Sequence, residues 1–192
     1  MKTPPPDLAD RLLAVSDDVL AVDADLRLED VARMVGASRA TLYYYFAGRD
    51  DLLAFLLSAH VREGAAAMAA ADDGQGPPAD RLRAVVVAMA GYLGGRPGTC
   101  AALLAAAGAR GALAPVLELN DARIAGPLRE LLTEGRATGA FDVAAPADAA
   151  NAILGAVLMA VLGRAAAGRD PADPDFTTAL ADQILRGVSA GG

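Results

Sequence analysis

The chain has 192 residues, a formal net charge of −7 and a composition that is 54% hydrophobic but only 4% aromatic. Alanine dominates, and because alanine is the strongest helix former, this composition favours an all-α protein. One cysteine and one histidine exclude an internal disulfide and a His-rich or Cys-rich metal site, and the acidic balance argues against DNA binding over the whole surface.

The N-terminal residues 1–10, MKTPPPDLAD, predict an extended lead-in through three prolines and a first helix capped by Asp7. The apolar residues of that helix recur at helical spacing, at Leu8, Leu12, Val15 and Val19. Residues 1–10 lack the apolar core of a secretory signal, and the longest uncharged run, 149–163, is shorter than the roughly 18 residues that a membrane span needs. We therefore expect a cytoplasmic protein without a membrane partner.

Residues 28–46, LEDVARMVGASRATLYYYF, divide into two short amphipathic helices joined by a turn. The first helix has one apolar stripe, formed by Leu28, Val31, Ala32 and Val35. Gly36 permits the positive φ that ends a helix, and Ser38 can cap the next one by accepting a bond from a free backbone N–H. The second helix runs from Arg39 to about Phe46 and completes a helix-turn-helix pattern.

The two sides of this second helix differ in chemistry. At about 100° per residue, one side gathers Leu42, Tyr45 and Phe46. The opposite side gathers Arg39, Ala40, Tyr43 and Tyr44. We interpret the first side as buried and the second as a face that reads DNA. The alternative is that the aromatic run 43–46 is only a plug for the core.

From Leu28 to Leu53 the sequence resembles the DNA-binding domain of the tetracycline-repressor (TetR) family. The positions that carry the resemblance are Ser38, Thr41, the Leu42-Tyr43 pair, the Tyr45-Phe46 pair and Arg49. The connection over 20–26 is shorter than in the family and lacks its glycine, which leaves Asp25 as the expected cap. Tyr44 stands where the family often has histidine. Beyond about residue 64 the resemblance is one of architecture only.

The resemblance implies an all-α fold of about nine helices in two domains. Residues 1–64 are expected to form a three-helix helix-turn-helix domain with the start of a linking fourth helix. Residues 65–192 are expected to form a larger helical ligand-binding and dimerisation domain. The implied function is that of a ligand-responsive repressor of transcription, which binds a palindromic operator as a homodimer and is released by a small apolar molecule.

The expected DNA-contacting residues are Ser38, Arg39, Ala40, Thr41, Tyr43, Tyr44 and Arg49. Arg39 can bond a guanine edge with two N–H groups, and Ala40 can touch a thymine methyl group. The hydroxyls of Thr41, Tyr43 and Tyr44 suit phosphates, and Arg49 can hold a phosphate beside the start of the following helix. From Arg27 to Arg49 four arginines stand against two acids, so a local basic excess exists within an acidic chain.

The loop DDGQGPP at 72–78 separates the linking helix from two very apolar helices near 81–93 and 99–109. Because few charges interrupt them, we expect both of these helices to be heavily buried. Cys100 is interpreted as a small buried apolar residue and His60 as a solvated or packed helix residue, not as reactive groups.

Three further helices are expected towards the C-terminus. A helical segment over 115–138 should kink or break just after Gly126, since Pro127 lacks the backbone N–H that a continuous helix needs. The last two helices are expected to begin at Pro146 and at the pair Asp173-Pro174, where aspartate caps and proline takes the first position.

A ligand pocket is expected inside the C-terminal domain, bounded by the linking helix, the two apolar helices and the kinked segment. Alanine and glycine are abundant there and aromatic residues are few, so the side chains can leave a space. The expected lining is Met89, Tyr92, Leu93, Cys100, Leu103 and Leu104, with Asn120 or Arg123 as a polar anchor. Such a pocket suits an apolar or amphipathic molecule. The alternative is a close-packed core without a cavity.

A homodimer is expected through the last two helices, at about 146–190. Apolar residues of the first of these cover more than one face, and its small residues would admit a partner helix: Ala152, Gly155, Ala156 and Ala160. With Phe176, Leu180 and Ile184 this helix can form a four-helix interface about a two-fold axis. The alternative is that it is the central helix of a monomeric bundle.

No catalytic site can be assembled from the sequence. A Gly-rich phosphate loop is missing, and the carboxylates Glu118, Glu130 and Glu134 are spaced as on a solvated helix face. We therefore expect no enzyme activity, no cofactor and no metal. Two alternatives stay open: a helical sensor or partner-binding protein with a degenerate DNA-binding head, and a helical-bundle enzyme.

Overall fold

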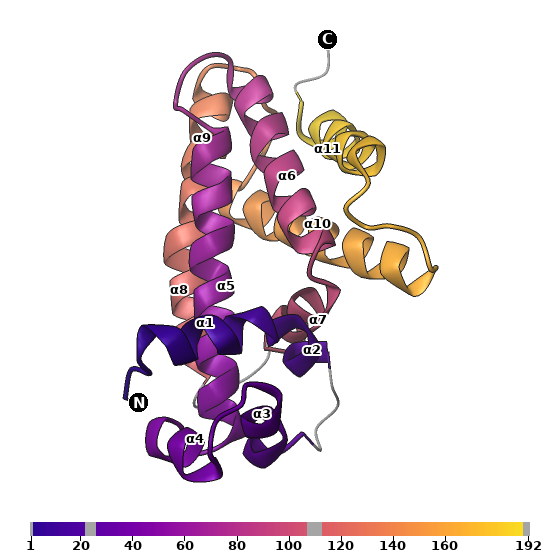
Figure 1. Ribbon diagram of the computed structural model, residues 1–192. Helices are drawn as coiled ribbons and strands as arrows, with labels where there is room; N and C mark the ends of the chain where they lie inside the picture. Colours follow the sequence, from indigo (N-terminus) through magenta and orange to yellow (C-terminus); the bar gives the residue numbers. More distant parts are fainter. Residues whose placement is uncertain (1, 22–25, 107–112, 190–192) are drawn as a thin grey trace. The chain divides into compact units, whose positions relative to one another are not determined.

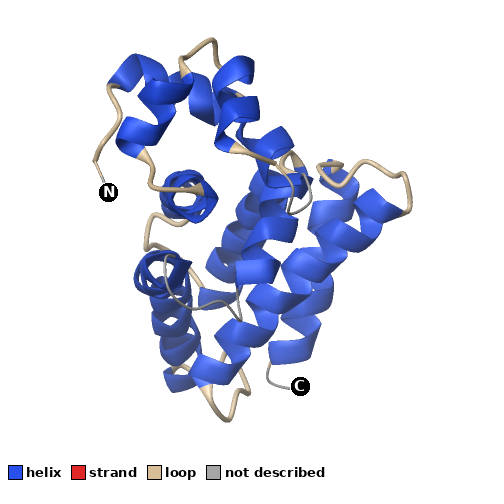
Figure 2. Cartoon of the chain, turned by 90° about the horizontal axis from the view of Figure 1, so that it is seen from below, coloured by secondary structure: helices blue, strands red, loops and turns tan. Residues whose placement is uncertain are grey.

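The structure, a computed structural model, describes residues 2–21, 26–106 and 113–189. Within these ranges the regular elements are helices, and strand-like pairing is limited to one isolated bridge between Phe141 and Ser189 (Figures 1 and 2). The predicted all-α class is therefore confirmed.

The chain forms two compact units, each built from two stretches of sequence. Unit 1 holds residues 1–60 and 98–118, and unit 2 holds residues 61–97 and 119–192. The chain thus crosses between the units three times, and each crossing falls inside a helix: α5, α7 or α8. The domain division expected at residue 64 remains a prediction.

The helices follow the expected order. Unit 1 contains α1 (Pro6–Ala14), α2 (Ser16–Ala21), α3 (Leu28–Met34), α4 (Arg39–Tyr45), the first part of α5 (Arg49–Ala71) and most of α7 (Pro97–Ala106) and α8 (Ala114–Asn120). Unit 2 contains the second part of α5, α6 (Pro78–Gly94), a π-helical turn η2 (Asp121–Ala125), α9 (Gly126–Ala137), α10 (Pro146–Ala166) and α11 (Pro174–Val188). The nine expected helices correspond to these elements when α1 with α2, and α8 with η2 and α9, are each taken as one interrupted segment.

The first four helices and the start of α5, together called the head, close around a small apolar core. Its largest side chains are at most 2% exposed: Leu8, Leu12, Leu42, Phe46, Leu52 and Leu56. Arg11 of α1 donates from Nη1 to the Val35 carbonyl at 2.6 Å, which satisfies a backbone group left free where α3 ends. Gly36 follows with the predicted positive φ, 62°.

Two predicted helix caps in the head are wrong. The N-cap of α1 is Pro5, so Asp7 lies inside the first turn instead of preceding it. Proline fixes φ and has no N–H to satisfy, so prolines can open this helix without a capping side chain. The N-cap of α3 is Arg27, whose backbone N–H donates to the Asp30 carboxylate at 3.2 Å. The residue expected there, Asp25, lies outside the described residues.

The start of α7 packs directly on α2 within unit 1. Asp17 Oδ1 accepts the backbone N–H of Thr99 at 2.8 Å and its hydroxyl at 3.2 Å. A Cβ added at Gly98 would lie 2.2 Å from the Asp17 carbonyl oxygen and 2.9 Å from the Ala21 Cβ. The glycine therefore allows a backbone-to-backbone approach that no other residue permits.

The single histidine and the single cysteine of the chain are both packed against other residues, as predicted. His60 is 4% exposed, and its Nε2 lies 2.8 Å from the Ser16 hydroxyl. Cys100 is fully buried, and burial, followed by the nearby charge of Asp17, raises the pKa of its thiol to about 12. A thiol held in this protonated state is a poor nucleophile.

The prediction that both apolar helices are heavily buried holds for α6 and is wrong for α7. In α7 the residues Gly98, Thr99 and Cys100 are buried, but Ala101, Leu104 and Ala105 are exposed. The absence of charges indicated an apolar helix correctly, but alanine side chains are small enough to remain at a surface at little cost.

In unit 2, α6 packs against α9, α10 and α11 (Figure 1 shows α11 beside α6). At Gly94 the loop between α10 and α11 approaches α6 closely, since an added Cβ would lie 2.3 Å from the Pro171 carbonyl oxygen. Gly139 ends α9 with φ 76°, and Gly168 follows α10 with φ 66°. Asp173 caps α11 by accepting the backbone N–H of Asp175 at 3.0 Å, as predicted for this pair with proline.

The predicted interruption near Pro127 takes the form of a π-helical turn, η2, one turn earlier than expected. The Gly126 N–H donates to the Asp121 carbonyl, five residues back instead of four. Pro127 lacks an N–H, and its ring would clash with a carbonyl of the preceding turn in a regular α-helix. The wider turn avoids that clash without ending the helical segment.

Candidate nucleic-acid interface and ligand cavity

The helix expected to read DNA is α4, and its start is built as predicted. The Ser38 hydroxyl accepts the Thr41 backbone N–H at 3.0 Å and lies 2.8 Å from the Thr41 hydroxyl. Ser38, Arg39 and Ala40 are exposed. This side-chain cap fixes where the helix begins and therefore which residues lie on each of its faces.

The aromatic residues of α4 and its C-cap divide as interpreted from the sequence for Phe46, Tyr43 and Tyr44, and only in part for Tyr45. Phe46 is fully buried and its ring packs 5.6 Å from that of Phe55. Tyr43 and Tyr44 are 44% and 60% exposed, so the alternative of a simple core plug is wrong for these two. Tyr45 is half-buried and meets the edge of Tyr44 at 4.9 Å between ring centroids.

A single acid, Glu29 of α3, contacts both Arg39 and Tyr43 on the exposed face of α4. Its Oε1 lies 3.1 Å from Arg39 Nε and accepts the Tyr43 hydroxyl at 3.2 Å. The Arg39 guanidinium also lies 5.3 Å from the centre of the Tyr43 ring. These contacts hold Arg39 and Tyr43 in place on the exposed face and cover part of the positive charge that DNA would meet.

Sequence reasoning did not identify two residues at this face. They are Glu29, which belongs to α3, and Lys2 of the N-terminal lead-in, whose Nζ lies 3.7 Å from the centre of the Tyr44 ring. Neither residue belongs to the periodic pattern of α4, so only the packing of α3 and of the N-terminal lead-in brings them there. Arg49, the predicted phosphate contact outside α4, is half-buried at the start of α5.

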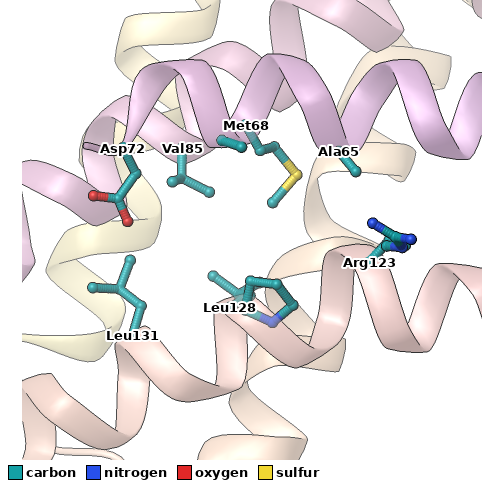
Figure 3. Close-up of a pocket in the computed structure, with 9 residues that line it drawn as sticks. Ala65, Met68, Asp72, Val85, Arg123, Leu128 and Leu131 are labelled. Carbon is teal, nitrogen blue, oxygen red and sulfur yellow. The ribbon is translucent and has the colours of Figure 1, made fainter. Parts of the chain in front are cut away.

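A cavity of about 200 Å³ lies within unit 2, between α5, α6 and the segment formed by η2 and α9 (Figure 3). It is lined by Ala65, Met68, Ala69, Asp72, Val85, Arg123, Pro127, Leu128 and Leu131. Figure 3 shows Asp72 at one end, Arg123 at the other, and the apolar side chains of Met68 and Leu128 between them. The cavity is thus an apolar space with a charged group at each end.

The charge at the Asp72 end is already matched by Arg81. Arg81 donates from Nε and Nη2 to Asp72 at 2.7 and 3.1 Å, and from Nη1 to Glu134 at 2.7 Å. The hydrogen bonds from Arg81 hold the pKa of the Asp72 carboxyl below its ordinary value. The three residues, which we call the Arg81 clasp, join the end of α5, the start of α6 and α9.

The cavity draws its lining largely from residues that the sequence did not indicate. Of the eight predicted ligand-binding residues, Arg123 lines it. Four others belong to the same unit: Met89, Tyr92, Leu93 and Asn120. The remaining three belong to unit 1: Cys100, Leu103 and Leu104. A ligand role for these seven residues stays a prediction.

Tyr92, the residue singled out by its ring and hydroxyl, has partners within unit 2. Its hydroxyl donates to Glu63 Oε2 at 2.9 Å, and the Arg96 guanidinium lies 4.2 Å from the centre of its ring. A Cβ on Gly64 would lie 3.4 Å from the same ring. Burial, followed by the Glu63 carboxylate, raises the pKa of the hydroxyl above its ordinary value.

The helix expected at a dimer interface, α10, carries apolar surface that the described residues of its own chain leave uncovered. Both α5 and α10 are long and apolar enough to cross a membrane by length and composition alone, but only 22% of the α10 window is buried, against 39% for α5. The uncharged run 149–163 is shorter than this helix, because Asp148 and Arg164 both lie inside α10 and end the run. Met159 is 56% exposed, and apart from its chain neighbours and the adjacent α10 backbone, no described atom lies within 4 Å of a Cβ added at Gly155.

Comparison with protein families gives two matches. Residues 24–55 match the family described as bacterial regulatory proteins, tetR family. Residues 75–188 match a tetracyclin repressor-like C-terminal domain. Among curated proteins, no sequence matches the chain.

Solved structures share the fold over nearly the whole chain. A tetR-family regulatory protein from Rhodococcus RHA1 superposes with a TM-score of 0.83 at 17% identity, covering 98% of this chain and 100% of that one. The fatty acid degradation regulator FadR from Bacillus halodurans gives 0.76 at 17% identity, covering 97% and 98%. FadR from Bacillus subtilis, in complex with stearoyl-CoA, gives 0.77 at 16% identity, covering 94% and 97%. At these identities the likeness concerns the fold.

Proposed function

Because the chain belongs to the tetracycline-repressor family of bacterial regulatory proteins, we propose that it is a repressor that binds a palindromic operator as a homodimer. A small amphipathic molecule held in unit 2 releases it from DNA. The family match makes the chain a DNA-binding regulator of transcription; the operator symmetry, the repression and the release belong to the proposal. So do its action in the cytoplasm and its lack of enzyme activity.

The observation that carries the proposal is the exposed face of α4. Seven residues from Arg39 to Tyr45 form a helix whose outer side presents Arg39, Ala40 and two tyrosine hydroxyls, while Leu42 and Phe46 anchor the inner side. The major groove is about 12 Å wide, which admits such a helix, and arginine is the side chain that most often reads guanine there. Thr41 and Arg49 are proposed to hold the flanking phosphates.

The uncovered apolar side of α10 supports the homodimer. A monomeric protein rarely leaves a long apolar helix face in water, and a two-fold axis would let the same face cover its copy. Ala152, Ala156 and Met159 are exposed on that helix. Two copies of α4, related by the axis, would then address two half-sites of DNA.

Ligand control is proposed to act through α5, which continues from unit 1 into unit 2 without interruption. A ligand that prefers one conformation of unit 2 shifts the population of DNA-binding states by its difference in affinity. The Bacillus subtilis relative was solved with an amphipathic acyl ligand, stearoyl-CoA, which supports a ligand of amphipathic character here.

Selection of bound sequences from a random DNA pool tests the proposal. We expect enrichment of a palindrome, and light scattering should give a particle of twice the 19.4 kDa chain mass. Met159→Glu should produce monomers and reduce operator affinity, whereas Thr178→Glu, an exposed change on α11, should do neither. A pool without any enriched sequence would instead favour a sensor or partner-binding protein with a degenerate head.

A further inference from the structure

We infer that the cavity of unit 2 takes a small monocarboxylate, with its carboxylate bound by Arg123 and its apolar body between Met68, Leu128 and Leu131. The inference deepens the proposed ligand response and rests on it. It names the chemical class of the effector, which neither the family nor the fold specifies.

The sign of the ligand charge follows from which ionic groups at the cavity already have partners. Asp72 accepts two hydrogen bonds from Arg81, so its negative charge is matched. The acid nearest to Arg123 in sequence, Asp121, accepts two hydrogen bonds from Arg129, at 2.5 and 3.1 Å. Within the described residues, the Arg123 guanidinium makes no hydrogen bond or ion pair. One unmatched positive charge at the cavity mouth therefore favours an anion.

Arg123 is suited to a carboxylate and not only to an anion in general. A guanidinium is planar and presents parallel N–H groups, which match the two oxygens of a carboxylate. The residue lies in η2, and π-helical turns recur at functional sites because they displace side chains from the regular helical positions. It is also exposed, so a charged group can reach it without entering the apolar part of the cavity.

The size of the ligand body follows from the cavity volume of about 200 Å³. A water molecule occupies roughly 30 Å³ of liquid, and a dry engineered cavity of about 150 Å³ in another protein holds one benzene. The space therefore fits roughly one aromatic ring with a short side chain, or about seven to eight aliphatic carbons. The chain of a stearoyl group is too long for it, so the ligand differs in size from that of the Bacillus subtilis relative.

Isothermal titration calorimetry on the full-length protein without DNA tests the inference directly. The probes are phenylacetate and octanoate, their neutral amides phenylacetamide and octanamide, and stearate. We expect both small acids to bind about tenfold more tightly than their amides, since a hydrogen bond to a charged group is worth about 1.4 kcal/mol more than a neutral one. Stearate should bind more weakly than octanoate.

Two variants with matched controls locate the site. Arg123→Gln should abolish the preference for acid over amide, whereas Arg62→Gln, which removes an exposed charge from α5, should preserve it. Ala65→Leu should fill the cavity and reduce binding of every probe at least tenfold, whereas Ala66→Leu on the exposed side of α5 should not. Circular dichroism melting curves show whether each variant is folded.

The outcomes separate this inference from the proposed function. Amides that bind as tightly as acids, an Arg123→Gln variant that keeps the preference, or a lack of binding by all small acids would overturn the inference, and operator binding by α4 would be unaffected. Acids that bind as expected at Arg123 but do not release the selected operator would uphold the site and overturn the proposed ligand response.

Discussion

Two arginines of this protein, Arg39 in the head and Arg81 in unit 2, both pair with carboxylates, but in opposite surroundings. The side chains of Arg39 and Glu29 are 71% and 30% exposed, whereas those of Arg81 and Asp72 are 14% and 17% exposed. Exposed pairs contribute only about 0–1 kcal/mol to stability, so the Arg39–Glu29 pair separates at little cost, as the proposed contact of Arg39 with DNA requires. A shielded pair is expensive to separate, because each charge loses its partner without regaining water. The exposed Arg39–Glu29 pair can therefore separate easily, whereas the shielded Arg81–Asp72 pair stabilises the fold.

The largest expected effect comes from breaking the shielded pair. Arg81→Ala removes three hydrogen bonds and leaves two carboxylates without their cation. We expect the free energy of unfolding to fall by about 2–3 kcal/mol, measured by urea denaturation. Arg83→Ala removes an arginine that is 44% exposed and pairs with Asp182, and it should cost less than about 1 kcal/mol.

The pH dependence of stability in the parent protein and in Arg81→Ala tests whether Arg81 stabilises the fold through the Asp72 carboxylate. The pKa of Asp72 is lowered in the folded state from its ordinary value of 3.8, so its pair stabilises the fold above that value. As pH falls through 3.8 towards the lowered pKa, this contribution is lost. Stability measured from pH 6 down to pH 3 should therefore decline more steeply in the parent than in Arg81→Ala. If stability fell equally with pH in both proteins, the Arg81 clasp would not be what lowers the pKa of Asp72.

The next effect concerns the exposed arginine. Arg39→Ala should relax the preference at one base position of the operator and cost about 1–3 kcal/mol in binding to the preferred sequence, with little change in fold stability. Arg49→Ala should weaken binding to all sequences alike, since a phosphate contact carries no base information. Fluorescence anisotropy with the selected operator and single-base variants separates the two. Parental binding by both variants would mean that this face does not contact DNA.

The smallest expected effect is a gain in operator affinity. Glu29→Gln keeps a hydrogen-bond acceptor for Tyr43 but removes the negative charge beside Arg39. Operator affinity should rise by about threefold at low salt, and the gain should shrink as salt increases. Asp30→Gln, which changes the neighbouring acid that pairs with Arg33, serves as the control for net charge. An affinity that falls in Glu29→Gln would show that Glu29 positions Arg39 for DNA instead of competing with it.

The head could be predicted closely because its signals are local. Gly36, Ser38 and the alternation of apolar and polar residues fix where α4 begins and which side it buries, and each depends on neighbours within a few residues. The errors at Asp7 and Asp25 arose where two residue types can begin a helix. Proline or an acid inside the first turn satisfies the same requirement, and the sequence does not rank them.

The cavity could not be predicted in the same way. Its lining combines Met68, Val85 and Leu131 from three helices, and helical periodicity does not tell which apolar face of each helix meets the others. The sequence did predict an irregularity at Pro127, and of the two polar anchors that it offered, Asn120 and Arg123, the second lines the cavity. It did not predict the π-helical form, because proline is equally compatible with a kink or a break.

The packing of Gly98 and Thr99 against Asp17 limits how this protein can be recombined with its relatives. The head keeps its native neighbours only if residues 98–118 travel with residues 1–60, since both stretches form unit 1. A chimaera made by a single junction within α5 would place a foreign helix start on α2. Any side chain larger than hydrogen at the Gly98 position would then overlap the Asp17 carbonyl. Sensors built by exchanging ligand-binding halves therefore need two more junctions, one at 97–98 and one at 118–119, to keep this reading head intact.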